Sequence, residues 1–268
     1  MRNSVEAPVA LQLKPIKRDF NLFVSLHPNA IHAYGVRSHK FEYCDMIELI
    51  FLCTKRRSKG QGVLILGTCD TGKTLMFYKL VYGGSKQPFT VTSVSPNTGD
   101  YVIPEKSKTL QMIDLPGHER LRLQMLEQKK SSARGIIYVV DSATIQKDIK
   151  EAAEFLYNIL SDSVILGNSL PVLVACNKQD QHLVKGASFI EKQLQKEINT
   201  LRVTRSAALQ QIDSSGNNNT FIGKRDKDFE FSDLKPLRVT FTECSALETA
   251  EGAQPGLTGV ESWLANLI

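Results

Sequence analysis

The chain has 268 residues, of which 42% are hydrophobic and 23% charged, as in ordinary globular proteins of one large or two small domains. Its net charge of +5 arises in residues 1–61, which contain ten Lys or Arg and five Asp or Glu, whereas residues 62–268 contain 23 of each. We therefore expect no direct binding of nucleic acid, because a surface that follows phosphates needs clustered Lys and Arg.

The five cysteines form neither a C-x-x-C pair nor a Cys/His set at metal-ligand spacing; they are Cys44, Cys53, Cys69, Cys176 and Cys244. We therefore expect neither a zinc site nor a disulfide framework. Three of them fall in or beside apolar runs and a Gly-rich loop, where reduced thiols behave as small apolar side chains. This usage favours a reducing compartment.

Residues 1–61 are predicted to be a separate basic segment at the N-terminus. No signal peptide is indicated, because no basic start is followed by a sustained apolar core and a cleavage site. An apolar stretch at 46–53 precedes basic residues at 55–59, an order typical of the cytosolic end of a membrane span. A span needs about 20 apolar residues, and this stretch is shorter and contains Glu48. It is therefore either an incomplete membrane anchor or a short amphipathic lead-in.

From residue 62 onward, short apolar runs alternate with segments of helical periodicity. Residues 83–98 are rich in Gly, Ser, Thr and Pro and are predicted to form a loop. The alternation predicts an α/β domain over residues 62–268, with a mainly parallel six-stranded sheet flanked by helices on both faces. Strands are expected at 63–66, 101–103, 109–113, 135–140, 170–175 and 237–241, and helices at 74–81, 149–160, 189–201 and 260–267.

The residues after the first strand fit G-x-x-x-x-G-K-[ST], the loop that binds phosphate between a buried strand and a helix. Its backbone amides and the positive end of the helix dipole are suited to phosphate. We expect Lys73 to neutralise the β- and γ-phosphates and the Thr74 hydroxyl to ligate Mg²⁺. For this motif alone, a Gly-rich turn of purely structural purpose is the alternative. The predicted phosphate-binding residues are Gly67, Thr68, Cys69, Asp70, Thr71, Gly72, Lys73 and Thr74.

A second motif, Asp-Leu-Pro-Gly-His at 114–118, follows the strand at 109–113. An Asp at the end of a strand, downstream of a phosphate loop, is placed to hold Mg²⁺ directly or through water. The backbone N–H of Gly117 can approach a γ-phosphate because glycine has no side chain. Taken alone, the same residues could form a simple turn.

Two further motifs follow the strands at 170–175 and 237–241. In Asn177-Lys178-Gln-Asp180, the Asp180 carboxylate can accept two hydrogen bonds from guanine, whereas adenine offers no such pair of donors. Lys178 can lay its aliphatic stem on the base, and Asn177 can tie loops together. The last motif places small side chains and a backbone amide near a purine carbonyl, and its residues are Cys244, Ser245 and Ala246.

In this order, the four motifs resemble the guanine-nucleotide-binding set of the Ras-like GTPase superfamily, near its Arf-like branch. Longer segments resemble the beta-subunit family of the signal recognition particle receptor, and they extend into the segment before the last strand. These segments are 114–124, 130–134, 139–143, 175–180, 199–208 and 229–231.

The resemblance implies a P-loop NTPase with the Ras-like GTPase fold that binds GTP or GDP with Mg²⁺. It further implies a heterodimer with the receptor's alpha subunit, bound in the GTP state, and an indirect link to the ribosome and the translocation channel. The family resides on the cytosolic face of the endoplasmic reticulum membrane, anchored by one N-terminal span. The stretch at 46–53 is shorter than the full span expected of the family. Two alternatives stay open: an Arf-like vesicle-traffic GTPase, and a GTP-locked scaffold without useful hydrolysis.

The resemblance also suggests roles for two further residues. His118 stands where many Ras-like enzymes carry a glutamine that orients the attacking water, so it is the candidate catalytic residue. It could equally be turned away or pack at a partner interface, and we expect slow intrinsic hydrolysis. A switch-loop ligand for Mg²⁺ is expected at Thr92 or Ser93, and the resemblance favours Ser93.

Residues 202–236 are longer than the connection an α/β unit needs and are predicted to be an insertion in the GTPase domain. Its polar part at 214–220 is expected to be mobile, and its charges at 224–228 to be a solvated face. Arg202 and Arg205 are expected to pack internally rather than contact a partner. A candidate partner surface, with solvated charge as its alternative, comprises Arg120, Arg122, Lys129, Lys130 and Arg134.

Overall fold

The computed structural model describes residues 60, 62–83, 93–209, 221–247 and 256–268. All of them lie in one of two compact units, residues 57–268. The apolar stretch at 46–53, Cys44, Cys53, Thr92 and the polar segment 214–220 lie outside the described residues. Among the helices that are described, none is long and apolar enough to cross a bilayer.

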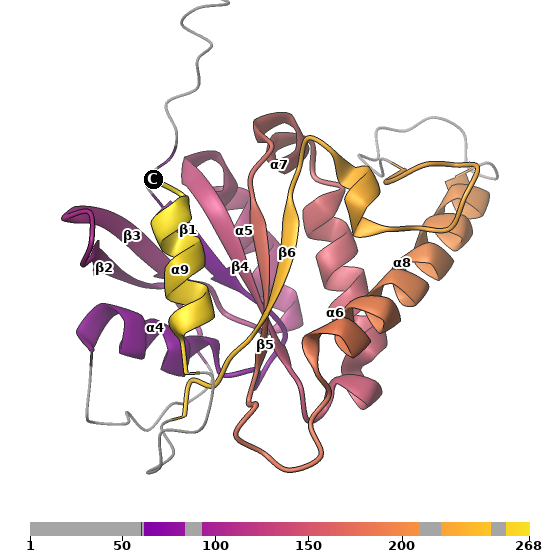
Figure 1. The fold of residues 1–268 in the computed structure, drawn as a ribbon. Coiled ribbons are helices and arrows are strands. Elements are labelled where there is room, and N and C mark those ends of the chain that lie inside the picture. Colours follow the sequence, from indigo (N-terminus) through magenta and orange to yellow (C-terminus); the bar gives the residue numbers. More distant parts are fainter. Residues whose placement is uncertain (1–59, 61, 84–92, 210–220, 248–255) are drawn as a thin grey trace, which may run out of the picture. The chain divides into compact units, whose positions relative to one another are not determined.

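The domain is built on a six-stranded sheet in the order β2-β3-β1-β4-β5-β6 (Figure 1). β2 runs antiparallel to β3, and the other neighbouring strands pair in parallel. This confirms the predicted mainly parallel α/β sheet. The strands are β1 (Gly62–Leu66), β2 (Asn97–Ile103), β3 (Lys108–Asp114), β4 (Ala133–Asp141), β5 (Val172–Asn177) and β6 (Val239–Glu243).

Helices cover both faces of this sheet and bury two separate cores. One core packs α5, α6, α7 and α8 on one face, and the other packs α4 and α9 on the opposite face (Figure 1). The central strands β1 and β5 are buried along their whole length, which explains their unbroken apolar sequence. The helices are α4 (Lys73–Tyr82), α5 (Glu119–Lys129), α6 (Ile145–Leu160), α7 (Ser163–Asn168), α8 (Ala187–Leu209) and α9 (Thr258–Asn266), and the 3₁₀ turns are η1 (Lys130–Ser132) and η2 (Phe231–Leu234).

The structure differs from the sequence prediction at several element boundaries. β2 begins at Asn97, inside the range predicted as a loop, because it pairs residue by residue with β3. Helix α7 was not predicted. Its start carries a recognisable capping residue, Asp162, which accepts hydrogen bonds from Val164 N at 2.8 Å and Ile165 N at 3.1 Å.

Helix α8 continues to Leu209, so the first eight positions of the predicted insertion are helical. Arg202 is buried on this helix, and its guanidinium donates to the carbonyl oxygens of Lys224 and Lys227. Arg205 donates to Asn158 Oδ1 at 2.7 Å and to Glu154 at 2.8 Å. The prediction that both arginines pack internally is confirmed.

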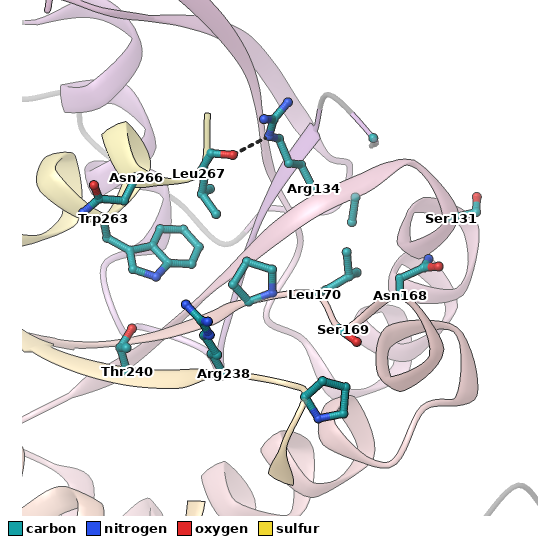
Figure 2. Close-up of a pocket in the computed structure, with 14 residues that line it drawn as sticks. Ser131, Arg134, Asn168, Ser169, Leu170, Arg238, Thr240, Trp263, Asn266 and Leu267 are labelled. Atoms are coloured by element: carbon teal, nitrogen blue, oxygen red, sulfur yellow. Dashed lines mark hydrogen bonds between the residues drawn. The ribbon is translucent and has the colours of Figure 1, made fainter. Parts of the chain in front are cut away.

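A cavity of about 770 Å³ lies at the amino-terminal ends of β4, β5 and β6 (Figure 2). Ala133 begins β4, Pro171 precedes β5, and Arg238 precedes β6. The four predicted nucleotide motifs follow the carboxyl-terminal ends of strands. The cavity is therefore at the opposite edge of the sheet from those motifs.

Candidate nucleotide-binding site

The loop between β1 and α4 adopts the curled backbone expected of the first motif. Gly67 and Gly72 have φ values of 148° and 87°. Asn177 Nδ2 donates to the carbonyl oxygen of Thr71 at 2.8 Å, and a Cβ on Gly72 would lie 2.4 Å from that nitrogen. Glycine is therefore required at position 72 for the two loops to approach. In the same loop Thr68 and Thr71 are buried, whereas Cys69 and Asp70 are exposed.

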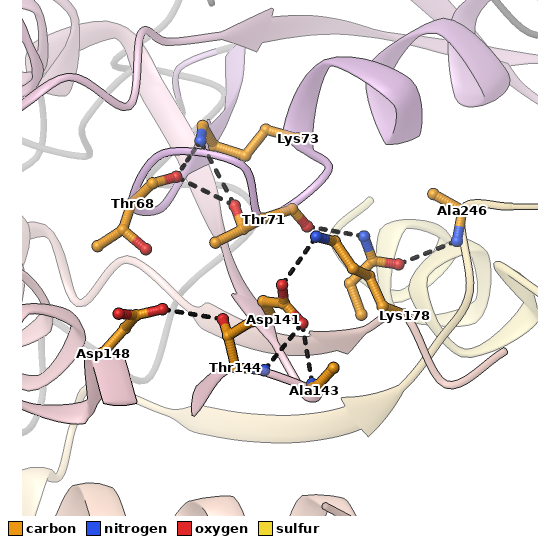
Figure 3. A network of polar contacts seen from close by, with 10 residues as sticks. Thr68, Thr71, Lys73, Asp141, Ala143, Thr144, Asp148, Lys178 and Ala246 are labelled. Atoms are coloured by element: carbon orange, nitrogen blue, oxygen red, sulfur yellow. Dashed lines mark hydrogen bonds and ion pairs between the residues drawn. The ribbon is translucent and has the colours of Figure 1, made fainter. Parts of the chain in front are cut away.

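The Lys73 side chain folds back over its own loop (Figure 3). Its Nζ donates to Thr68 O at 2.5 Å and lies 3.4 Å from Thr71 Oγ1. Burial lowers the pKa of Lys73, while the charge of Asp114 acts in the opposite direction. A buried ammonium held by two neutral oxygens is suited to phosphate, because an anionic ligand would offset the cost of its desolvation.

Asp114 ends β3 and is fully buried. Its Oδ2 accepts hydrogen bonds from Thr74 Oγ1 at 2.9 Å and Asn97 Nδ2 at 3.1 Å. Its Oδ1 is buried without a hydrogen-bond partner among the described residues. Burial raises the pKa of Asp114, whereas the two hydrogen bonds and Lys73 act to lower it. A buried oxygen that lacks a partner needs a ligand, and carboxylate oxygen is the ligand type that Mg²⁺ prefers.

Three predicted metal ligands are brought together here. The Thr74 hydroxyl contacts both Asp114 and Ser93, and its Oγ1 lies 3.4 Å from Ser93 Oγ. The residues present therefore fit a Mg²⁺ ion, although the choice between Ser93 and Thr92 stays a prediction. Asn97 was missed in the sequence, which carries no motif for it. Its role follows from the register of β2 and β3, which places Asn97 directly opposite Asp114.

The second motif places Gly117 against the phosphate loop. A Cβ on Gly117 would lie 2.6 Å from Lys73 Nζ and 2.8 Å from Thr68 O, so only glycine permits this approach. The neighbouring His118 is exposed and precedes α5, where its Nδ1 accepts a hydrogen bond from Arg120 N at 3.3 Å. The observed role of His118 is thus a helix cap, and its catalytic role stays a prediction.

The guanine motif and the last motif are joined by hydrogen bonds. Asn177 donates to the phosphate loop, and its Oδ1 accepts from Ala246 N at 2.9 Å. Ser245 Oγ donates to Asp180 Oδ1 at 2.6 Å, which fixes the orientation of that carboxylate. The buried Cys244 thiol lies 3.9 Å from Asn177 Oδ1, and burial raises its pKa to about 12. Asn177 therefore ties together the loops after β1, β5 and β6, as expected.

Asp141, at the end of β4, is a second residue that sequence reasoning missed. Its Oδ2 forms an ion pair with Lys178 Nζ at 2.7 Å, and its Oδ1 accepts from Ala143 N at 2.8 Å (Figure 3). Lys178 itself has a φ of 66°. The ion pair therefore links the guanine motif to the end of β4 and restrains the Lys178 side chain. Two signals were available in the sequence: the position of Asp141 after a buried strand, and its place in the resembling segment 139–143.

Three of the five residues of the candidate partner surface make contacts within the domain, and the surface itself stays a prediction. Arg122 is buried, donates to Glu151 Oε1 at 2.5 Å and lies over the Phe155 ring at 4.7 Å. Lys130 pairs with Asp162 at 2.6 Å, and Arg134 Nε donates to Leu267 O at 2.9 Å. These three charges anchor the domain's own helices, whereas Arg120 is exposed.

The sequence of the chain matches a known protein family. Residues 58–238 match the family model described as the signal recognition particle receptor beta subunit. The chain is 48% identical over 214 residues to the signal recognition particle receptor subunit beta of Rattus norvegicus, covering 79% of this chain and 78% of that protein.

Solved structures show the same fold. The structure of the mammalian SRP receptor is 44% identical, with a TM-score of 0.66, and the match covers 77% of this chain and 100% of that chain. The Chaetomium thermophilum receptor is similar in fold as an SRb-GTP/SRX complex, at 19% identity and a TM-score of 0.60 over 77% of this chain and 100% of that chain. Its SRb-GDP-Mg structure matches at 21% identity and a TM-score of 0.60, over 80% of this chain and 100% of that chain.

Proposed function

Because the chain belongs to the beta-subunit family of the signal recognition particle receptor, we propose that it is that receptor's GTP-binding regulatory subunit. In this role it binds the alpha subunit in its GTP state during cotranslational targeting to the endoplasmic reticulum. Residues 62–268 are the GTPase domain, with an insertion at about 202–236. Residues 1–61 are an N-terminal basic segment with an incomplete or absent membrane anchor. The ribosome and the translocation channel are indirect partners.

The observation that carries the proposal is the hydrogen-bonded junction of four strand-end loops. Asn177 connects the phosphate loop to the last motif, and Ser245 orients Asp180. A carboxylate held in this way presents acceptors to the ring N–H and exocyclic amine of guanine. At the other end of the ligand, Lys73 and the backbone amides of the phosphate loop can bind the phosphates. The Chaetomium thermophilum structures with GTP and with GDP and Mg support the same ligands here.

Thr74, Ser93 and Asp114 are the residues that would hold Mg²⁺. When bound, the ion would neutralise charge on the β- and γ-phosphates. Asn97 and Thr74 hold the Asp114 carboxylate so that its free Oδ1 keeps one orientation. Gly117 brings its backbone beside Lys73, where it can respond to the γ-phosphate. These contacts support a site that distinguishes GTP from GDP.

Slow hydrolysis fits this role better than rapid cycling. The His118 Nδ1 lone pair is used by the backbone of α5, so orienting a water molecule falls to its other ring nitrogen or requires the cap to break. Single-turnover hydrolysis of bound GTP, with and without the alpha subunit's N-terminal domain, tests this assignment. Fast turnover that His118→Ala leaves unchanged would rule out a catalytic role for His118.

The guanine assignment is tested by Asp180→Asn in the full chain. Loss of two charge-assisted hydrogen bonds should weaken GDP binding roughly 10²- to 10³-fold. The introduced amide can instead donate to the additional carbonyl oxygen of xanthine, so XDP should become the preferred ligand. Competition of GDP, XDP and ADP against a fluorescent nucleotide measures both effects.

Asp226→Asn is the matched control, because Asp226 is exposed on the insertion and should leave every affinity unchanged. Retention of wild-type GDP preference by Asp180→Asn would contradict the assignment.

A further inference from the structure

The cavity at the amino-terminal ends of β4, β5 and β6 has no role in nucleotide binding, yet its size is typical of a ligand site (Figure 2). Its volume is about 770 Å³. It is lined from the starts of three strands and from the last turn of α9. The nucleotide loops follow the other ends of the same strands, so a ligand here would not compete with nucleotide.

The charge of the lining favours an anion. Arg134 and Arg238 both contribute to it, and none of the 14 described lining residues is Asp or Glu. The guanidinium of Arg238 is exposed and makes no hydrogen bond or ion pair within the described part of the chain. Arg134 uses its Nε for Leu267 O, which leaves its two terminal nitrogens as donors. Guanidinium groups are well suited to phosphate because they can donate two parallel hydrogen bonds.

The other polar lining residues add neutral hydrogen-bond donors, as a headgroup with hydroxyls would require. The apolar part of the lining includes Trp263, an amphipathic side chain that is favoured at membrane–water interfaces. The lining thus combines cationic side chains, neutral side chains that can bind hydroxyl groups, and an interfacial tryptophan. The neutral polar residues of the lining are Ser131, Asn168, Ser169, Thr240 and Asn266.

The sequence that precedes the cavity residue Gly60 is also suited to an anionic ligand. Gly60 lines the cavity and directly follows Lys55-Arg56-Arg57-Ser58-Lys59, four cations in five residues. Such clusters bind anionic lipid surfaces when they are tethered close to a membrane. The composition of this run thus matches the cationic lining of the cavity, and both suit an anionic phospholipid.

We propose that this cavity binds the phosphate-bearing headgroup of an anionic phospholipid. This edge of the sheet then faces the bilayer, and the switch residues at the opposite edge stay free for a partner. The inference adds a lipid site to the proposed membrane location, but it does not depend on the guanine assignment.

Trp263 makes the proposal directly measurable, because it is the only tryptophan in the 268-residue chain. The GDP-loaded full chain is mixed with phosphatidylcholine vesicles that carry a brominated lipid, with or without phosphatidylinositol. We expect quenching of Trp263 and co-flotation only with phosphatidylinositol. Vesicle binding that leaves Trp263 unquenched would overturn the proposal, because the cavity would then face away from the membrane.

Arg134→Gln/Arg238→Gln should weaken vesicle binding by roughly fivefold per arginine, hence about 25-fold for the pair. The matched control is Lys147→Gln/Lys150→Gln, which removes the same charge from exposed positions near the start of α6, at the nucleotide edge, and should change binding less than about twofold. Equal losses in both double variants would overturn the site in favour of general charge attraction.

Two further measurements distinguish loss of the lipid site from misfolding of a variant and from loss of nucleotide binding. Arg238→Gln alone breaks no side-chain hydrogen bond or ion pair among the described residues, so the variant should fold normally and still lose about fivefold in vesicle binding. Unchanged GDP affinity in each variant shows that nucleotide binding is intact, so failure of the lipid site leaves the proposed function standing. If soluble glycerophosphoinositol shifts Trp263 emission but vesicles do not bind, the ligand is a free phosphate ester and the proposal is wrong.

Discussion

Asp114 illustrates how single residues of this site favour ligand binding over stability. Its carboxylate is fully buried, one oxygen lacks a partner among the described residues, and burial raises its pKa. A carboxyl group whose pKa is raised by folding destabilises the fold once the pH exceeds its unfolded value of about 3.9. Without ligand at neutral pH, Asp114 therefore lowers stability.

Asp114→Asn should accordingly stabilise the nucleotide-free chain at pH 7 by roughly 1–2 kcal/mol, because a buried charge is removed. The gain should disappear below about pH 4, where the wild-type carboxyl is protonated in both states. Thermal unfolding in EDTA across this pH range measures the effect. The same variant should lose the stabilisation that Mg²⁺ adds to the GDP-bound wild type, and a variant that still responds to Mg²⁺ would contradict the assigned ligand.

Helix α5 is the element in which the sequence prediction of a partner surface was least accurate. Its Arg122 and the following Lys130 and Arg134 were expected at a surface, but Arg122 and Lys130 are buried and pair with Glu151 and Asp162. Arg134 is half-buried, and its Nε donates to Leu267 O. The sequence shows only that these residues are cationic. Which cations find an internal acceptor depends on how α5, α6 and α9 pack, and no local pattern contains that information.

Arg202 links helix α8 to the later part of the insertion. Among the described residues, no carboxylate pairs with this buried arginine. It donates to Asn199 Oδ1 at 2.8 Å and to the carbonyls of Lys224 and Lys227, and it lies over the rings of Phe221 and Phe229. Arg202→Met should lower the free energy of unfolding by about 2–4 kcal/mol, because the insertion loses three hydrogen bonds from a buried guanidinium.

Urea unfolding measures this loss, and GDP affinity should stay unchanged because the insertion lies away from the four nucleotide motifs. The control is Arg225→Met, which removes an exposed arginine that stacks on Phe221 at 5.1 Å and should cost less than about 1 kcal/mol. Equal stability of Arg202→Met and the wild type would show that the insertion is held by its apolar contacts instead.

At the scale of the whole molecule, the sequence predicts the sheet and the nucleotide motifs well because both depend on local patterns. Buried parallel strands read as continuous apolar runs, and the motifs must follow those strands at fixed spacing. What the sequence could not predict are contacts between segments. Asn97 reaches Asp114 through strand register, Asp141 reaches Lys178 across two strands, and His118 is used as a cap.

With the proposed lipid site, the sheet has one candidate ligand site at each end of its parallel strands. The carboxyl-terminal edge holds the nucleotide motifs and the switch residues, and the amino-terminal edge holds the basic cavity beside Gly60. Because the parallel strands β1, β4, β5 and β6 separate these two ends, the proposed lipid site and the proposed partner surface would not compete for the same residues.

The most direct test of this account is the affinity of the receptor alpha subunit's N-terminal domain for the full chain in each nucleotide state. Calorimetry with a non-hydrolysable GTP analogue and with GDP should show binding at least about tenfold tighter in the GTP state, within the usual range of coupling between two sites. Asp180→Asn should show the same preference only with xanthine nucleotides. Equal affinity of the alpha domain for the GTP-analogue and GDP forms would contradict the account.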